Sequence, residues 1–156
     1  MSFDTTSYSL VGAPELLLRL RRYMEATGLL CSDYIIDHSG NEPSHLIDRT
    51  FSIDLQSDNS GIYRDEAPLR MRHTAVVTLI WTLAPHDSFA SQVAALRQEE
   101  ELIRSVQLQA TTAEVRIAWA STARALSPSR EHLILRITFQ VAHDWYGVPF
   151  DTAVSA

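Results

Sequence analysis

A chain of 156 residues with 46% hydrophobic and 21% charged side chains has the composition of one globular domain, long enough to bury a core without metal ions or disulfides. The only cysteine, Cys31, excludes an intrachain disulfide. The chain shows neither a secretory signal nor an apolar run of about 18 residues for a membrane span, so we expect a soluble intracellular product or a component assembled inside a cell. The formal net charge of −6 argues against stable binding to nucleic-acid backbones.

All 13 basic side chains are arginines, for which the simplest explanation is genomic base composition. The absence of lysine still excludes several chemistries, because a phosphate loop of the G-x-x-x-x-G-K-[ST] type, a Schiff-base site and a kinase-type phosphate site all need that residue.

The first predicted element is a helix over residues 14–27. Pro14 suits a first helical turn, since its missing N–H would be unpaired there, and Gly28 suits the left-handed position after the last turn. Between them runs an apolar stripe of Leu16, Leu17, Leu20, Tyr23 and Met24.

The next segments carry strand patterns. Tyr34–Ile36 is a candidate short strand, and residues 49–56 alternate so that Phe51, Ile53 and Leu55 share one face of a strand whose other face is polar. After a polar loop over residues 57–68, residues 71–83 place apolar groups on both faces, which predicts a central strand covered on each side.

A second helix is expected over residues 89–107, capped by Asp87 or Ser88. Residues 114–119 and 132–141 alternate like strands, and residues 120–130 between them suggest a loop. The apolar positions of the predicted helix are Phe89, Val93, Leu96, Ile103 and Val106.

These elements predict an α+β fold with a mixed, mainly antiparallel sheet of about four strands and two main helices, in the order α-β-β-α-β-β. No linker divides the chain, so residues 1–156 are expected to form one domain. Its core spans about residues 14–143, with an N-terminal arm over 1–13 and a C-terminal tail over 144–156.

Signatures of catalysis are missing from the sequence. Three of the six histidines stand next to an aspartate, but no H-x-x-x-H or C-x-x-C spacing occurs, and no G-x-S-x-G or dinucleotide-binding motif can be built from five isolated glycines. We therefore expect no catalytic residue, no cofactor and no metal. An active site assembled only in space stays open, because such sites are recognised by geometry.

Candidate contact residues come from three segments. The run Glu99, Glu100 and Glu101 is either the solvated face of the second helix or the lining of an acidic channel between copies of the chain. The long loop is either a simple connection or an arm reaching a partner, and the aromatic tail is either docked on its own core or an anchor for a neighbour. Their candidate residues are Asp58, Asn59 and Tyr63 in the loop and Trp145, Tyr146 and Phe150 in the tail.

The order of elements over residues 14–143 resembles that of the tail terminator proteins of long-tailed bacteriophages and the related minor tail proteins of the neck. The resemblance is carried by the helix, the strand over residues 48–55, the long strand over residues 70–83, the helix after it and the hairpin over residues 113–141. No invariant signature accompanies this order, and the aromatic stretch after His143 is not part of the family pattern.

The resemblance implies a structural virion protein, assembled in the host cytoplasm, that forms a ring, usually of six subunits. Such a ring caps the tail tube and joins it to the head through a neck or connector protein. DNA passes through without specific binding, and no membrane is involved. Two alternatives stay open, namely a head-completion or connector subunit of the neck, and a cellular α+β enzyme or small-ligand-binding dimer.

Overall fold

A computed structural model describes residues 13–36, 47–57, 69–84, 88–111 and 115–145. The elements in chain order are α1 (Ala13–Glu25), β1 (Leu30–Cys31), β2 (Thr50–Ser57), β3 (Leu69–Thr82), α2 (Phe89–Ser105), the π-helical segment η1 (Val106–Ala110), β4 (Val115–Leu126) and β5 (His132–Trp145). The α+β class and the predicted order are confirmed, with five strands where about four were expected.

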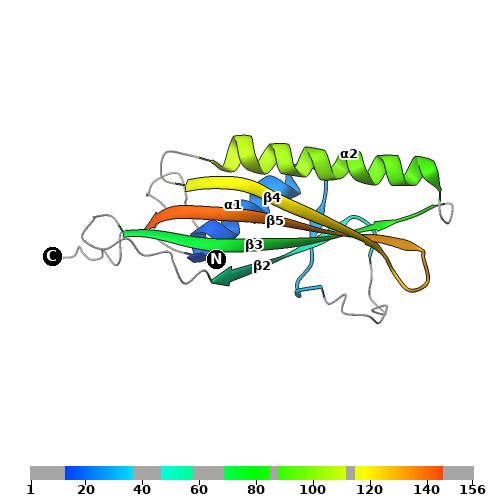
Figure 1. Cartoon of the computed structure of the whole chain (residues 1–156), viewed down its shortest axis with the longest axis horizontal. Coiled ribbons are helices and arrows are strands. Elements are labelled where there is room, and N and C mark those ends of the chain that lie inside the picture. Colours follow the sequence, from blue (N-terminus) through cyan, green and yellow to red (C-terminus); the bar gives the residue numbers. More distant parts are fainter. Residues whose placement is uncertain (1–12, 37–46, 58–68, 85–87, 112–114, 146–156) are drawn as a thin grey trace.

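The five strands form one sheet in the order β1-β2-β3-β5-β4 (Figure 1). Strands β2, β3, β5 and β4 pair antiparallel with their neighbours, whereas β1 pairs parallel with β2. Because β3 and β4 both run antiparallel to β5, they are parallel to each other, as the helical connection through α2 allowed. The second hairpin strand, β5, lies between them.

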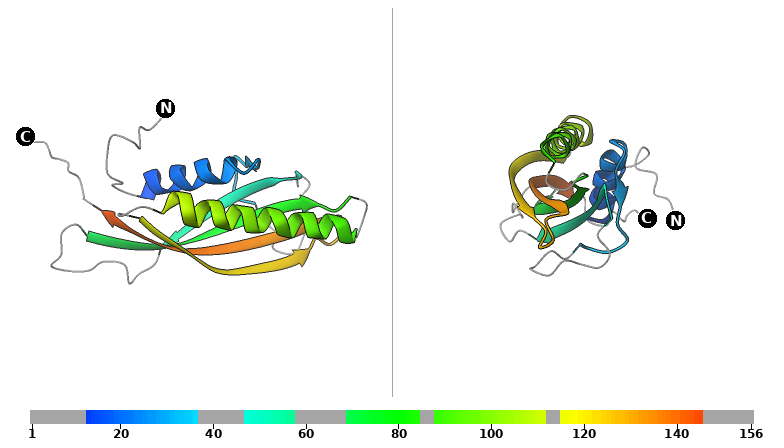
Figure 2. Two further views of the ribbon diagram at one scale, coloured as in Figure 1. Left: turned by 90° about the horizontal axis from the view of Figure 1, so that it is seen from above. Right: turned by 90° about the vertical axis from the view of Figure 1, so that its right-hand side faces the viewer.

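Both helices cover the same face of the sheet (Figure 2). Alternate residues of the two central strands point toward them, including Val77 and Leu79 of β3 and Ile137 and Phe139 of β5, all fully buried. From the helices, the fully buried side chains of this core are Leu16, Leu20, Met24, Ala95, Leu102 and Val106.

The opposite face of the sheet is covered only in part. Ile36, Ile80 and Ile134 form a small buried cluster there, and the backbone N–H of Ile36 donates to Ser52 Oγ at 3.0 Å. The expectation of two covered faces for β3 is confirmed over residues 76–80, which are buried on both faces, but not at the exposed Arg72. The expectation of a solvated second face for β2 is wrong at Ser52, which is 3% exposed.

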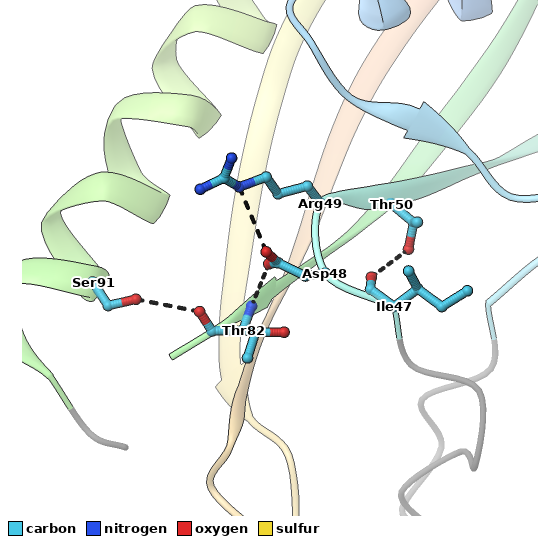
Figure 3. A network of polar contacts seen from close by, with 6 residues as sticks. All are labelled: Ile47, Asp48, Arg49, Thr50, Thr82 and Ser91. Atoms are coloured by element: carbon cyan, nitrogen blue, oxygen red, sulfur yellow. Dashed lines mark hydrogen bonds and ion pairs between the residues drawn. The ribbon is translucent and has the colours of Figure 1, made fainter. Parts of the chain in front are cut away.

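A polar network joins the end of β3 to the start of β2 and to α2 (Figure 3). Asp48 accepts a hydrogen bond from the Thr82 backbone N–H at 2.8 Å and contacts Arg49 Nε at 3.5 Å. Ser91 of α2 donates to the Thr82 carbonyl oxygen at 3.3 Å, and the Arg49 guanidinium lies 4.9 Å from the Trp81 ring centroid. The network satisfies backbone groups at one end of the sheet.

The predicted helix starts and stops agree closely with the structure. Gly28 has φ +94°, the left-handed conformation expected after α1, and Ser88 caps α2 by accepting from the Ser91 N–H at 3.3 Å. Leu17 is wrongly placed in the apolar stripe of α1, because it is 37% exposed.

Two strand predictions are wrong. Tyr34–Ile36 is not a strand, and the two-residue strand β1 precedes it, held by parallel pairing with β2. The segment expected as a loop from residue 120 belongs to β4 as far as Leu126. Its small, mostly exposed side chains lack the alternation of apolar and polar residues, so pairing with β5 makes this segment a strand.

The apolar positions predicted for the second helix do not form its buried face. The side chains that α2 buries are Ala95, Glu99, Leu102 and Ser105, with Val106 following in η1. Of the predicted set only Val106 is buried, whereas Phe89 is 80% exposed. The predicted apolar set and the observed buried set lie on different sides of the helix. Because the sheet contacts α2 on one side alone, it cannot bury both sets.

Candidate interaction surface

Apart from Ile47, the large exposed apolar side chains of the described residues gather near the two edges of the sheet. Strands β4 and β1 are the terminal strands of the sheet order, and among the described residues each pairs on one side only. A terminal strand with open backbone groups and apolar neighbours is a ready site for protein contact.

The first of these surfaces, the α2–β4 strip, consists of the exposed Phe89, Leu96, Leu108, Trp119 and Leu126 together with the half-buried Ile103. Phe89, Leu96 and Ile103 recur every seven residues, so they lie along one side of α2. Ile103, Leu108 and Trp119 line a groove of about 500 Å³ between the helix and β4. Leu108 is 74% exposed and Trp119 is 45% exposed, so the groove is open to a partner.

A β-bulge in β4 places Arg124 and Leu126 on the same side of the sheet as Trp119. The pairing with β5 shifts between Trp119 and Ser121, which leaves Ala120 as an extra residue. After the bulge Arg124 and Leu126 pair with Leu135 and Leu133, and therefore face the helices as Trp119 does. Without the shift these two side chains would face the opposite side of the sheet.

An ion pair forms one wall of the groove. Arg124 donates from Nε and Nη2 to the two carboxylate oxygens of Glu99, each at 3.0 Å. The Glu99 side chain is 4% exposed and that of Arg124 is 50% exposed. These hydrogen bonds raise the pKa of Arg124, and the paired charges fix the distance between α2 and β4.

The second surface, the α1–β1 strip, consists of Leu17, Leu18, Leu30, Tyr34 and Ile35. Tyr34 is 79% exposed and Ile35 is 63% exposed, both in the segment that follows β1. They line a smaller groove of about 220 Å³ together with Leu17, Leu18, Arg21, Cys31, Ser32, Asp33, Ser52 and Ile53. Burial raises the pKa of the Cys31 thiol on the floor of this groove.

Charges are nearly balanced at both surfaces, in contrast to the net −6 of the whole chain. The α2–β4 groove is lined by the carboxylates Glu99 and Glu100 and by the guanidinium groups of Arg104 and Arg124. The α1–β1 groove is lined by one charge of each sign, Arg21 and Asp33. Neither groove therefore has a charge excess that would repel another copy of an acidic chain.

A histidine pair lies on the helix-covered side of the sheet, one residue each from β3 and β5. His73 Nε2 and His143 Nε2 are 3.0 Å apart, and the two rings stack with centroids 5.0 Å apart. One imidazole must donate and the other accept, so at most one of these two nitrogens has a proton. The described residues hold no group of three or more His, Cys, Asp or Glu side chains arranged to bind a metal ion.

The candidate contact residues predicted from the sequence lie in different environments in the structure. Glu100 and Glu101 are exposed on α2, whereas Glu99 is turned inward to Arg124. Trp145 ends β5, and its side chain is not described. Asp58, Asn59, Tyr63, Tyr146 and Phe150 lie outside the described residues. Their roles in contacts stay predictions.

Sequence reasoning missed the residues of the two strips. One signal was present in α2, where Phe89, Leu96 and Ile103 recur in a helix that also has the buried set Ala95, Leu102 and Val106. Two apolar faces on one helix indicate two partners, only one of which is the helix's own sheet. No helix within the described ranges is long and apolar enough to cross a membrane.

Comparisons with known proteins give likenesses to solved structures only. No protein-family model matches the chain, and no match was found among curated proteins. Among the solved structures that the chain resembles is a chain from the virion of a native gene transfer agent particle. The TM-score is 0.43 with 17% sequence identity, over 92% of this chain and 99% of that chain.

Proposed function

We propose that this protein is a structural virion component, a ring-forming tail terminator that caps a phage tail tube and joins it to the head or neck. The confirmed α+β fold with the order of elements typical of that family supports the proposal. The observation that carries it is the pair of exposed apolar strips at opposite edges of one sheet. A chain with two such surfaces can contact two neighbours at once.

The distribution of charge is compatible with a ring around DNA. Exposed carboxylates such as Glu100 and Glu101 and a net charge of −6 disfavour binding to phosphates, so DNA could slide through without being held. We assign Glu101, which does not line the α2–β4 groove, to the lumen side of the ring. In this proposal the partners are other copies of the chain, six in all, together with the tube protein and a neck or connector protein.

Electron microscopy of purified protein incubated with tail tubes of the same virion tests this function. We expect a ring at one end of each tube and tubes that no longer lengthen when more tube protein is added. The control is the same protein incubated with heads that lack tails. Rings on heads and bare tube ends would contradict the terminator role in favour of a connector subunit.

A further inference from the structure

We propose that copies of this chain join head to tail, with the segment Leu30–Ile35 of one copy seated in the α2–β4 groove of the next. This inference deepens the proposed ring by naming its two contact surfaces, and in that sense it rests on the proposed function. Tyr34 is its central anchor. The receiving side chains are Ile103, Leu108 and Trp119.

The inserting segment has the properties of an interface anchor. Leu30, Tyr34 and Ile35 are each more than 60% exposed, although all three are large and apolar or aromatic. An aromatic side chain buries about 150–250 Å² when it enters a pocket, and tyrosine is enriched at the centres of interfaces. Burial of these side chains in a complementary groove therefore lowers the free energy of the assembled state.

The receiving groove has the volume, the apolar lining and the arginine side chains to bind this segment. Its volume of about 500 Å³ and its mixed lining of apolar side chains and arginines suit a tyrosine beside a carboxylate. Glu99 occupies two of the five N–H groups of Arg124, and half of the arginine side chain is exposed. Asp33, which precedes Tyr34, provides an acceptor for Arg124 or Arg104 of the neighbouring copy.

The positions of the two surfaces decide the symmetry of the contact. Strands β2, β3 and β5 separate β1 from β4, so the two edges lie about 19 Å apart at about 4.8 Å per strand. A contact between two different edges leaves one free surface of each kind on every dimer. Such heterologous contacts continue until they close into a ring or extend as a filament.

Two charge substitutions test the contact. Tyr34→Asp disables the inserting segment, and Leu108→Asp disables the groove. At 79% and 74% exposure neither change removes a core side chain. Each variant alone should need roughly tenfold or more protein to assemble. Sedimentation velocity measures the mass, and circular dichroism checks that both variants are folded.

Mixing the two variants gives the decisive result. Each retains one intact surface, so an equimolar mixture should form a two-chain species and stop there, because the remaining surfaces are both disabled. The matched control is Ala94→Asp, at an exposed position on the outer side of α2, which should assemble like the unmodified chain. Ile35→Asp serves as a second variant of the inserting segment and should behave as Tyr34→Asp does.

Three outcomes would overturn the contact. They are an unmodified chain that stays monomeric, a single variant that assembles normally, and a mixture that remains monomeric because each surface binds some other partner. The function is tested separately. Rings that follow these rules but ignore tube ends would contradict the terminator role alone, whereas normal tube capping by Tyr34→Asp would contradict the contact alone.

Discussion

The ion pair between Glu99 and Arg124 is asymmetric at the scale of single residues, because one partner is buried and the other is half in water. Removing Arg124 leaves a carboxylate with no counter-charge inside the protein, whereas removing the charge of Glu99 leaves an arginine that water can solvate. The two substitutions therefore have unequal effects on stability.

We expect Arg124→Ala to lower the free energy of unfolding by about 2–3 kcal/mol and Glu99→Gln by about 1 kcal/mol. Urea unfolding followed by circular dichroism measures both values. Arg97→Ala, at an exposed position of the same helix, is the control and should change stability by less than about 0.5 kcal/mol. Equal losses for the two pair variants would show that Glu99 is solvated in solution.

Cys31 gives a prediction about pH. Burial raises the pKa of its thiol, and the positive charge of Arg21 partly opposes that effect. Since only the thiolate reacts, alkylation by iodoacetamide should require a higher pH in the folded protein than in the urea-unfolded protein. Arg21→Met should move the midpoint of the rate profile to still higher pH. A folded-state midpoint below the unfolded one would contradict the assignment.

At the scale of elements, α2 links the core to the surface. Its buried side contacts the sheet through Ala95 and Leu102, another side carries Phe89 and Leu96 toward solvent, and the half-buried Ile103 packs against the core. The first turn is held by Ser88, whose hydroxyl accepts from the Ser91 N–H, and Ser91 in turn donates to Thr82 of β3.

Loss of the cap should weaken the whole domain, since α2 contributes to its core. We expect Ser88→Ala to lower the free energy of unfolding by about 1 kcal/mol, and Ser88→Asp to be close to neutral because a carboxylate caps equally well and suits the positive helix end. Thermal unfolding checks both variants. Ser121→Ala, an exposed change in β4, is the control and should leave the midpoint unchanged.

At the scale of the whole molecule, net charge and exposed apolar area act in opposite directions on assembly. A charge of −6 makes copies repel one another, whereas contact through the two strips removes apolar surface from water. Salt weakens only the first effect, because the Debye length falls from about 30 Å at 0.01 M to about 3 Å at 1 M.

We therefore expect assembly to strengthen as the concentration of sodium chloride is raised. Sedimentation velocity at a fixed protein concentration measures the fraction of assembled chain across a salt series. Leu108→Asp provides the control, because it should stay unassembled at low salt and respond less to added salt. Dissociation by salt would show that ion pairs hold the copies together.

Much of the fold was accessible from the amino-acid order alone. The helix signals at Gly28 and Ser88, the alternation around Phe51 and the two-sided β3 all depend on local chemistry, because dihedral preferences and the repeat of apolar residues act over a few neighbours. Residues 120–126 could not be predicted as strand, since their mostly small side chains carry no regular apolar alternation and their conformation comes from pairing with β5.

The sequence by itself determined the fold class, the order of elements and an acidic chain without lysine. Only the tertiary structure decided which side of α2 is buried, that the bulge at Ala120 turns Arg124 toward Glu99, and that β1 and β4 end at opposite edges. The physical reason is that a repeat of apolar residues shows only that one side of an element packs against something apolar. Which element it packs against depends on contacts between segments far apart in the chain.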